Sequence, residues 1–208
     1  PVKPELNKGK KVYGLIVTEN NAMENFIFSE ELVQYFAENI EYFSAQMPEK
    51  KVYLLVPPSA CEFYAPQKYK TDDNSQKKAF EFLKSNLTDT IFIDAYSEIE
   101  KHSDEYVYFR TDHHWTAKGA YYAYEAFAKK AQFETVPLSN LESGYIEGFL
   151  GTIYKTVSKY SQSEKLEKNP DFIEYFIPEV SYDAFSYDST DMISEKSIKL
   201  VSEEYDKD

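Results

Sequence analysis

Short apolar runs alternate with longer segments of helical periodicity through the first 132 residues of this chain. The runs at residues 51–56 and 90–93 are apolar at nearly every position, which is typical of strands buried on both faces of a parallel sheet. Residues 29–47, 74–87 and 116–132 repeat apolar side chains every three or four positions and are predicted helices. Such an alternation predicts a layered α/β domain with a mostly parallel central sheet.

Smaller elements complete the predicted order. We predict a core domain over residues 1–137 and a loop and β-rich extension over residues 138–208. In the core, we expect short strands at 11–17 and 25–28, a short helix at 95–101 and an extended piece at 106–109. In the extension, we expect loops at 144–154 and 158–169, and strands at 171–177 and 180–187.

Charge and cysteine content narrow the classes of function. The 36 acidic residues outnumber the 23 basic ones, and a net charge of -13 repels phosphate backbones, so we expect no nucleic-acid partner. Cys61 is the only cysteine, which excludes an intrachain disulfide and a cysteine-based zinc site. Its apolar neighbours predict a core residue. No apolar stretch approaches the length of a membrane span.

The rarest side chains of the chain are concentrated in residues 108–116, Tyr-Phe-Arg-Thr-Asp-His-His-Trp-Thr. This run holds the only Arg, the only Trp and two of the three His. It lies between the extended piece and the helix predicted at 116–132, where ligands gather in α/β sheets. A carboxylate two residues before an imidazole, here Asp112 and His114, can orient that ring as a general base. We therefore predict the functional site here.

Two other interpretations of this run stay open. In a structural one, Asp112 caps a helix, His114 is a buried hydrogen-bonded ring and Trp115 anchors the core. In a metal site, the ligands would be Asp112, His113, His114 and either His102 or Asp94. Adjacent side chains on an extended strand point in opposite directions, however, so His113 and His114 should not share an ion, and we predict no metal and no other cofactor.

The run from Tyr106 to Tyr121, with Asp-His-His-Trp at its centre, resembles the signature of the DHHW family. That family is similar to the SGNH-hydrolase-like alginate O-acetyltransferases, whose comparable motif is Asp-x-His-Trp. The segments Val56–Ala60 and Phe149–Tyr154 fit the same pattern, so the resemblance extends over most of the chain from about Leu32. It implies an SGNH-hydrolase-like α/β fold and a carbohydrate O-acyltransferase or esterase, extracellular or at the cell surface, with its signal peptide removed.

The resemblance also assigns roles to residues. Asp112 would orient the ring of His114, and His114 would be the base that activates a serine hydroxyl. His113 falls at the variable position of the motif and receives no catalytic role. The residues grouped around the pair as binding residues are Arg110, His113, Trp115 and Ser59. For Arg110, binding a carboxylate, holding the loop and forming a surface ion pair all remain open.

The nucleophile is the part of the mechanism that the chain does not supply clearly. The resemblance implies a serine on a later strand-to-helix turn, and the Asp188-Ser189 pair has no glycine-rich turn or helix behind it. Ser59 follows a core strand, but the family does not place its nucleophile at that point of the fold. We therefore expect the nucleophile-bearing segment to be missing and this chain to be inactive alone. The expected partners are a polysaccharide or cell-wall glycan and a membrane protein that supplies the acyl group. The alternative is a non-catalytic extracellular glycan-binding or structural domain.

Overall fold

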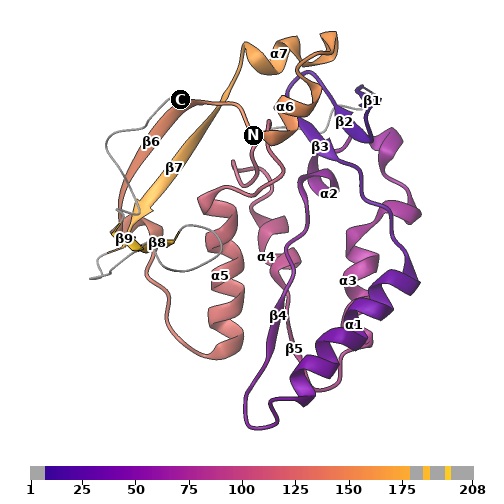
Figure 1. Ribbon diagram of the computed structural model, residues 1–208, viewed down its shortest axis with the longest axis vertical. Helices are drawn as coiled ribbons and strands as arrows, with labels where there is room; N and C mark the ends of the chain where they lie inside the picture. Colours follow the sequence, from indigo (N-terminus) through magenta and orange to yellow (C-terminus); the bar gives the residue numbers. More distant parts are fainter. Residues whose placement is uncertain (1–7, 179–184, 188–194, 198–208) are drawn as a thin grey trace. The chain divides into compact units, whose positions relative to one another are not determined.

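The computed structural model describes residues 8–178, 185–187 and 195–197 (Figure 1). The chain divides into two compact units, the first formed by residues 1–135 and 145–174 and the second by residues 136–144 and 175–208. The Asp-His-His-Trp motif belongs to the first unit, whereas the domain boundary predicted at residue 137 stays a prediction. Within the described ranges, no helix is both long enough and apolar enough to span a membrane.

The parallel strand pair expected from the two apolar runs is present. Strands β4 (Tyr53–Leu55) and β5 (Ile91–Ile93) pair in parallel, with Tyr53 opposite Ile91. The fold is a mixed α/β fold as predicted, but a mostly parallel central sheet is confirmed only in part, because this sheet has two strands among the described residues.

The strand predicted at residues 11–17 is two strands of an antiparallel sheet, and the strand predicted at residues 25–28 is not found, because the third strand of the sheet ends at Glu24. The sheet contains β1 (Lys10–Val12), β2 (Leu15–Val17) and β3 (Ala22–Glu24). Tyr13 and Gly14, with φ of 51° and 78°, join β1 to β2. Two successive residues in the left-handed region make the tight turn that favours antiparallel pairing over a single long strand.

The four predicted helices are confirmed, and two of them begin at a serine cap. They are α1 (Glu30–Ala45), α3 (Gln76–Ser85), α4 (Ala95–Lys101) and α5 (Ala117–Ala131). The side chain of Ser29 accepts the N–H of Leu32, and that of Ser75 accepts the N–H of Lys78. Four short elements were not predicted: α2 (Ala60–Tyr64) and the 3-10 turns η1 (Gln67–Tyr69), η2 (Asp72–Asn74) and η3 (Leu138–Asn140).

Two segments predicted as loops have regular structure. Residues 142–149 form β6 (Glu142–Phe149), the partner of β7 (Asp171–Ile177), and α6 (Thr152–Val157) follows. Residues 158–169 contain η4 (Ser161–Ser163) and α7 (Glu164–Glu167), and Leu166 is buried. β7 has its predicted bounds, and β8 (Phe185–Tyr187) and β9 (Glu195–Ser197) form an antiparallel pair. The predicted β-rich extension is thus found in part.

Two hydrophobic clusters hold the first unit together. One includes Ile16, Ile99 and Val107, and the other joins β1 and β2 to α6 and α7. Gly119 brings the start of α5 against this core, because a Cβ at this position would lie 2.3 Å from the carbonyl oxygen of Val107. The close approach fixes the residues just before α5, which carry the motif.

Glu41 of α1 fastens the loop that precedes β5. Its carboxylate accepts hydrogen bonds from the N–H groups of Thr88, Asp89 and Thr90 and from the Thr88 hydroxyl. Burial alone would raise the pKa of Glu41, but these hydrogen bonds outweigh it and lower the pKa from 4.5 to about 2.

A pH dependence of stability follows from this carboxylate. Because the folded-state pKa is depressed, the stabilisation is present above pH 4.5 and is lost as the pH falls toward 2. We expect Glu41→Gln to lower the free energy of unfolding at neutral pH. The difference in this free energy between wild type and variant should shrink as the pH falls from 4.5 to 2. Urea unfolding at several pH values measures it. A gap that is constant from pH 7 to pH 2 would contradict the assignment, and Glu38→Gln on the same helix is the control.

Candidate functional site

The motif occupies a loop that is closed at its base. Tyr108 and Trp115 form an antiparallel bridge, and the N–H of Phe109 donates to the carbonyl of His114 at 3.2 Å. Thr116 then caps α5 by accepting the N–H of Gly119. The loop is therefore held at both ends, and it lies immediately before a helix, as the sequence predicts.

Asp112 and His114 face each other within this loop. The Nδ1 of His114 lies 2.6 Å from Oδ1 of Asp112, and the N–H of His114 donates to the same oxygen at 3.0 Å. The Asp112 side chain is only 4% exposed, whereas that of His114 is 64% exposed. A carboxylate can only accept here, so Nδ1 of His114 carries the proton and Nε2 holds the free lone pair. Within the described part of the chain, nothing hydrogen-bonds that Nε2.

The second oxygen of Asp112 is held by the start of α6. Both the N–H and the hydroxyl of Thr152 donate to Oδ2, at 2.8 and 2.9 Å. Gly151 makes this approach possible, because a Cβ there would lie 2.3 Å from the Cβ of Asp112. Burial would raise the pKa of Asp112, but the hydrogen bonds from Thr152 and His114 outweigh it and hold the pKa far below its usual range. The carboxylate is therefore charged at neutral pH.

His113 lies beside His114, contrary to the prediction that the two rings point apart. Their centroids are 3.9 Å apart with 37° between the planes. The prediction assumed an extended strand, but residues 110–114 form bends that turn both side chains to one side. Nδ1 of His113 lies 2.8 Å from the Thr152 hydroxyl. That hydroxyl gives its single hydrogen to Asp112, so Nδ1 of His113 is the donor.

A metal ion bound to Asp112 would have to displace one of its hydrogen bonds, because each oxygen of this carboxylate already accepts two. Asp112, His113 and His114 place one ligand atom each within 4.8 Å of one another. Both oxygens of Asp112 and the Nδ1 atoms of both rings, however, already have hydrogen-bond partners. The arrangement suits proton transfer better than metal coordination.

Arg110 anchors the loop through a residue that sequence reasoning missed. Its Nε donates to Oδ1 of Asp171 at 3.0 Å, and its Nη2 donates to the carbonyl of Pro170 at 2.7 Å. Asp171, which is buried, also accepts the N–H groups of Arg110 and Thr111 and the hydroxyls of Thr111 and Tyr106. Of the roles left open for Arg110, holding the loop is the one its contacts describe.

The other predicted residues lie around or away from this pair. Trp115 is half-buried and packs against the first hydrophobic cluster. Ser59 precedes α2, and its hydroxyl accepts the side-chain N–H of Gln76 at 3.0 Å and lies 3.4 Å from Sγ of Cys61. Its contacts connect it with Gln76 and Cys61 rather than with His114. Ser189 lies outside the described residues.

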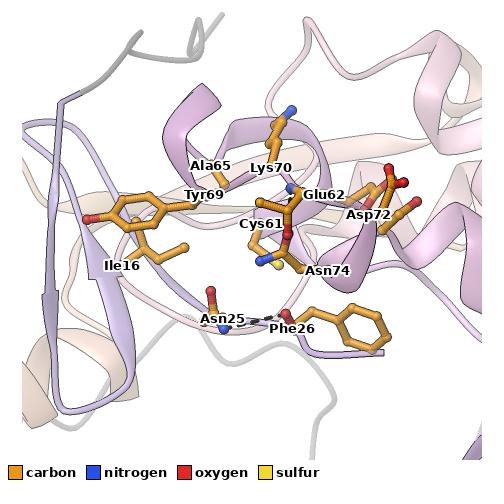
Figure 2. Close-up of a pocket in the computed structure, with 12 residues that line it drawn as sticks. Ile16, Asn25, Phe26, Cys61, Glu62, Ala65, Tyr69, Lys70, Asp72 and Asn74 are labelled. Atoms are coloured by element: carbon orange, nitrogen blue, oxygen red, sulfur yellow. Dashed lines mark hydrogen bonds between the residues drawn. The ribbon is translucent and has the colours of Figure 1, made fainter. Parts of the chain in front are cut away.

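Cys61 lies on the wall of a cavity of about 220 Å³ whose lining includes no residue of the motif (Figure 2). Asn25 and Phe26 lie on one side of it, with Ile16 and Tyr69 nearby (Figure 2). Burial raises the pKa of the Cys61 thiol. As predicted, Cys61 is a buried residue of the first hydrophobic cluster.

Solved structures share this α/β fold. A DHHW family protein from Eubacterium siraeum superimposes with a TM-score of 0.75 at 28% identity, over 85% of this chain and 57% of that one. Bacillus cereus PatB1 does so with a TM-score of 0.65 at 15% identity, over 84% of this chain and 62% of that one. The structure of Bacillus cereus PatB1 with a sulfonyl adduct superimposes with a TM-score of 0.62 at 16% identity, over 84% of this chain and 59% of that one. The chain thus spans about three fifths of the length of each.

The sequence profile described as "DHHW protein" matches residues 5–203, and the chain therefore belongs to the DHHW family. No curated protein matches the sequence. The resemblance predicted from the Asp-His-His-Trp run is confirmed.

Proposed function

We propose that the protein is an SGNH-like carbohydrate O-acyltransferase or esterase that acts outside the cell or at its surface. The observation that carries the proposal is the 2.6 Å contact between Asp112 and Nδ1 of His114, with the Nε2 lone pair directed away from it. A buried, charged carboxylate that fixes one tautomer of a solvent-exposed imidazole is the arrangement of a general base. The family's similarity to alginate O-acetyltransferases supplies the acyl-transfer chemistry.

The reaction has two steps. Nε2 of His114 takes the proton of a serine hydroxyl as its oxygen bonds to the carbonyl carbon of an acyl ester, and the imidazolium returns that proton to the departing alcohol. The acyl-serine then reacts with a glycan hydroxyl in the transferase, or with water in the esterase, and His114 again takes and returns one proton. Asp112 stabilises the imidazolium and stays charged throughout.

We assign the nucleophile to a serine outside the described residues, for which Ser189 is one candidate. A PatB1 structure carries a sulfonyl adduct, so a sulfonyl fluoride is the probe of choice. We expect phenylmethylsulfonyl fluoride to label one serine of the full-length protein, and peptide mass spectrometry to identify it. His114→Ala should abolish the labelling while leaving the fold intact by circular dichroism. No labelling, or labelling that survives His114→Ala, would overturn the proposal and favour the non-catalytic glycan-binding alternative.

Thr152 offers a graded test of the same site. Thr152→Val removes the hydroxyl that donates to Asp112 and accepts from His113, but keeps the N–H bond to Oδ2. Losing a charge-assisted hydrogen bond should lower kcat about tenfold. Thr152→Ser keeps the hydroxyl and should stay near wild type. Equal activity of the Val and Ser variants in an acetyl-ester hydrolysis assay would show that the hydroxyl has no role.

A further inference from the structure

A second cavity, of about 600 Å³, lies beside the motif loop in the first unit. Its size falls in the range of small-molecule sites, roughly 300–1,000 Å³. Its lining comes from β6, the start of β7 and the proline before β7: Tyr145, Glu147, Gly148, Pro170, Asp171 and Phe172. Gly148 has a φ of 81° and nothing lies within 4 Å of a Cβ placed on it, so the cavity is open there.

The ring of Tyr145 is exposed yet held in place. Tyr145 is 60% exposed, and its hydroxyl donates to Glu174 at 2.9 Å. Its ring meets Phe172 edge-to-face at 5.6 Å, and Phe172 in turn stacks on Tyr106 at 4.6 Å. An exposed aromatic face that is already fixed loses little conformational freedom when it binds a ligand.

The charge around the cavity favours hydroxyl donors over anions. Asp171 is paired with Arg110, and Glu174 is paired with Lys118. Glu147 has no hydrogen-bond or ion-pair partner within the described ranges, so its carboxylate is free to accept hydrogen bonds and would repel another carboxylate.

The cavity wall is hydrogen-bonded directly to the motif loop, residues 109–114. The carbonyl of Pro170 accepts from Arg110, and Asp171 accepts the N–H of Thr111, the residue before Asp112. A molecule bound against Pro170 and Asp171 therefore lies next to the loop that carries Asp112 and His114.

From these contacts we propose that this cavity is a glycan subsite that binds a neutral sugar ring. The C–H face of the sugar packs on Tyr145, and its hydroxyls donate to Glu147. The inference rests on the proposed function for its substrate class and narrows it: neutral sugars, such as hexoses or N-acetylhexosamines, bind here in preference to uronic acids.

Binding of defined oligosaccharides tests the subsite separately from catalysis. The probes are tetramers of N-acetylglucosamine, of glucose in β-1,4 linkage and of mannuronic acid, titrated into the full-length protein by calorimetry. We expect a neutral tetramer to bind and the mannuronate tetramer to bind at least tenfold more weakly. Tyr145→Ala should weaken the neutral tetramer about tenfold or more. Tyr145→Phe should retain binding, because the ring rather than the hydroxyl contacts the sugar.

Two further variants separate this inference from the proposed reaction. His114→Ala should bind the neutral tetramer like wild type, and Tyr42→Ala, which removes a 70% exposed tyrosine of α1, should do the same. If neither neutral tetramer binds, if mannuronate binds as well as the neutral tetramers, or if Tyr145→Ala leaves binding unchanged, the subsite is overturned. Loss of sulfonyl labelling in His114→Ala would still stand, because that result does not depend on the sugar.

Discussion

Replacing Asp112 by Asn is expected to lower kcat for acyl transfer by about 10³–10⁴-fold, with little change in KM. Each carboxylate oxygen of Asp112 faces two donors, Oδ1 those of His114 and Oδ2 those of Thr152. A carboxamide must set its NH₂ group against one of these pairs. Facing His114, it forces the proton of the ring onto Nε2, which then cannot accept from serine. Facing Thr152, it opposes the N–H that anchors α6.

Steady-state kinetics on an acetyl ester, with the full-length protein, measures this effect. The matched control is Asp94→Asn at the start of α4, where the side chain accepts the N–H of Ser97 and Asn caps equally well. A loss in kcat for Asp112→Asn without a loss in the Asp94 variant is the expected pattern. Near wild-type turnover with Asn at position 112 would remove Asp112 from the mechanism.

The largest effect on stability is expected from Asp171→Ala, about 3–5 kcal/mol. The buried carboxylate accepts hydrogen bonds from Tyr106, Arg110 and Thr111. Removing it leaves the N–H groups of Arg110 and Thr111 without their acceptor and leaves the Arg110 guanidinium without its counter-charge.

Chemical denaturation compares the free energies of unfolding. Asp171→Asn keeps one acceptor oxygen and should lie between wild type and Asp171→Ala. Asp104→Ala removes an exposed acid from the turn after α4 and should change stability by less than about 0.5 kcal/mol. If Asp171→Ala unfolds at the same denaturant concentration as the Asp104 variant, the proposed anchoring of the motif loop is wrong.

Local periodicity was enough to locate helices α1, α3, α4 and α5 and the parallel strand pair, but not the short helices α2, α6 and α7. Ser29 and Ser75 begin their helices where capping side chains precede apolar repeats. The strands β4 and β5 lie inside the two apolar runs. These features are set by residues close in sequence, so the sequence alone reveals them.

The prediction of a loop at 144–154 missed strand β6, because the strand that pairs with it lies far along the chain. The glycines and polar residues of this segment are typical of loops, and β7, the strand that pairs with it, begins at Asp171. Likewise, Leu166 is buried in a segment that is otherwise polar and charged. Long-range pairing and burial of a single side chain leave no local periodicity to detect.

In the candidate site too, contacts between residues close in sequence could be predicted and contacts between distant residues could not. The pairing of Asp112 with His114 was predictable, because the two residues lie two positions apart and the family motif names both. Thr152 and Asp171 were not, since they reach the motif from 40 and 60 residues away. Asp171 has no distinctive neighbours in the sequence. Thr152 lies in the segment 149–154 that fits the family pattern, but that fit does not indicate a contact with Asp112. The contact of His113 with Thr152 was missed for the same reason.

The anchoring of the loop by Asp171 also sets an order of events during synthesis. The ribosome completes Thr111 well before the acid that holds it, 60 positions later. Until β7 leaves the exit tunnel, no carboxylate is present to receive the loop's amide hydrogens. The helices form from residues that are close in sequence and do not depend on Asp171, so they should form before the Asp-His-His-Trp loop becomes ordered.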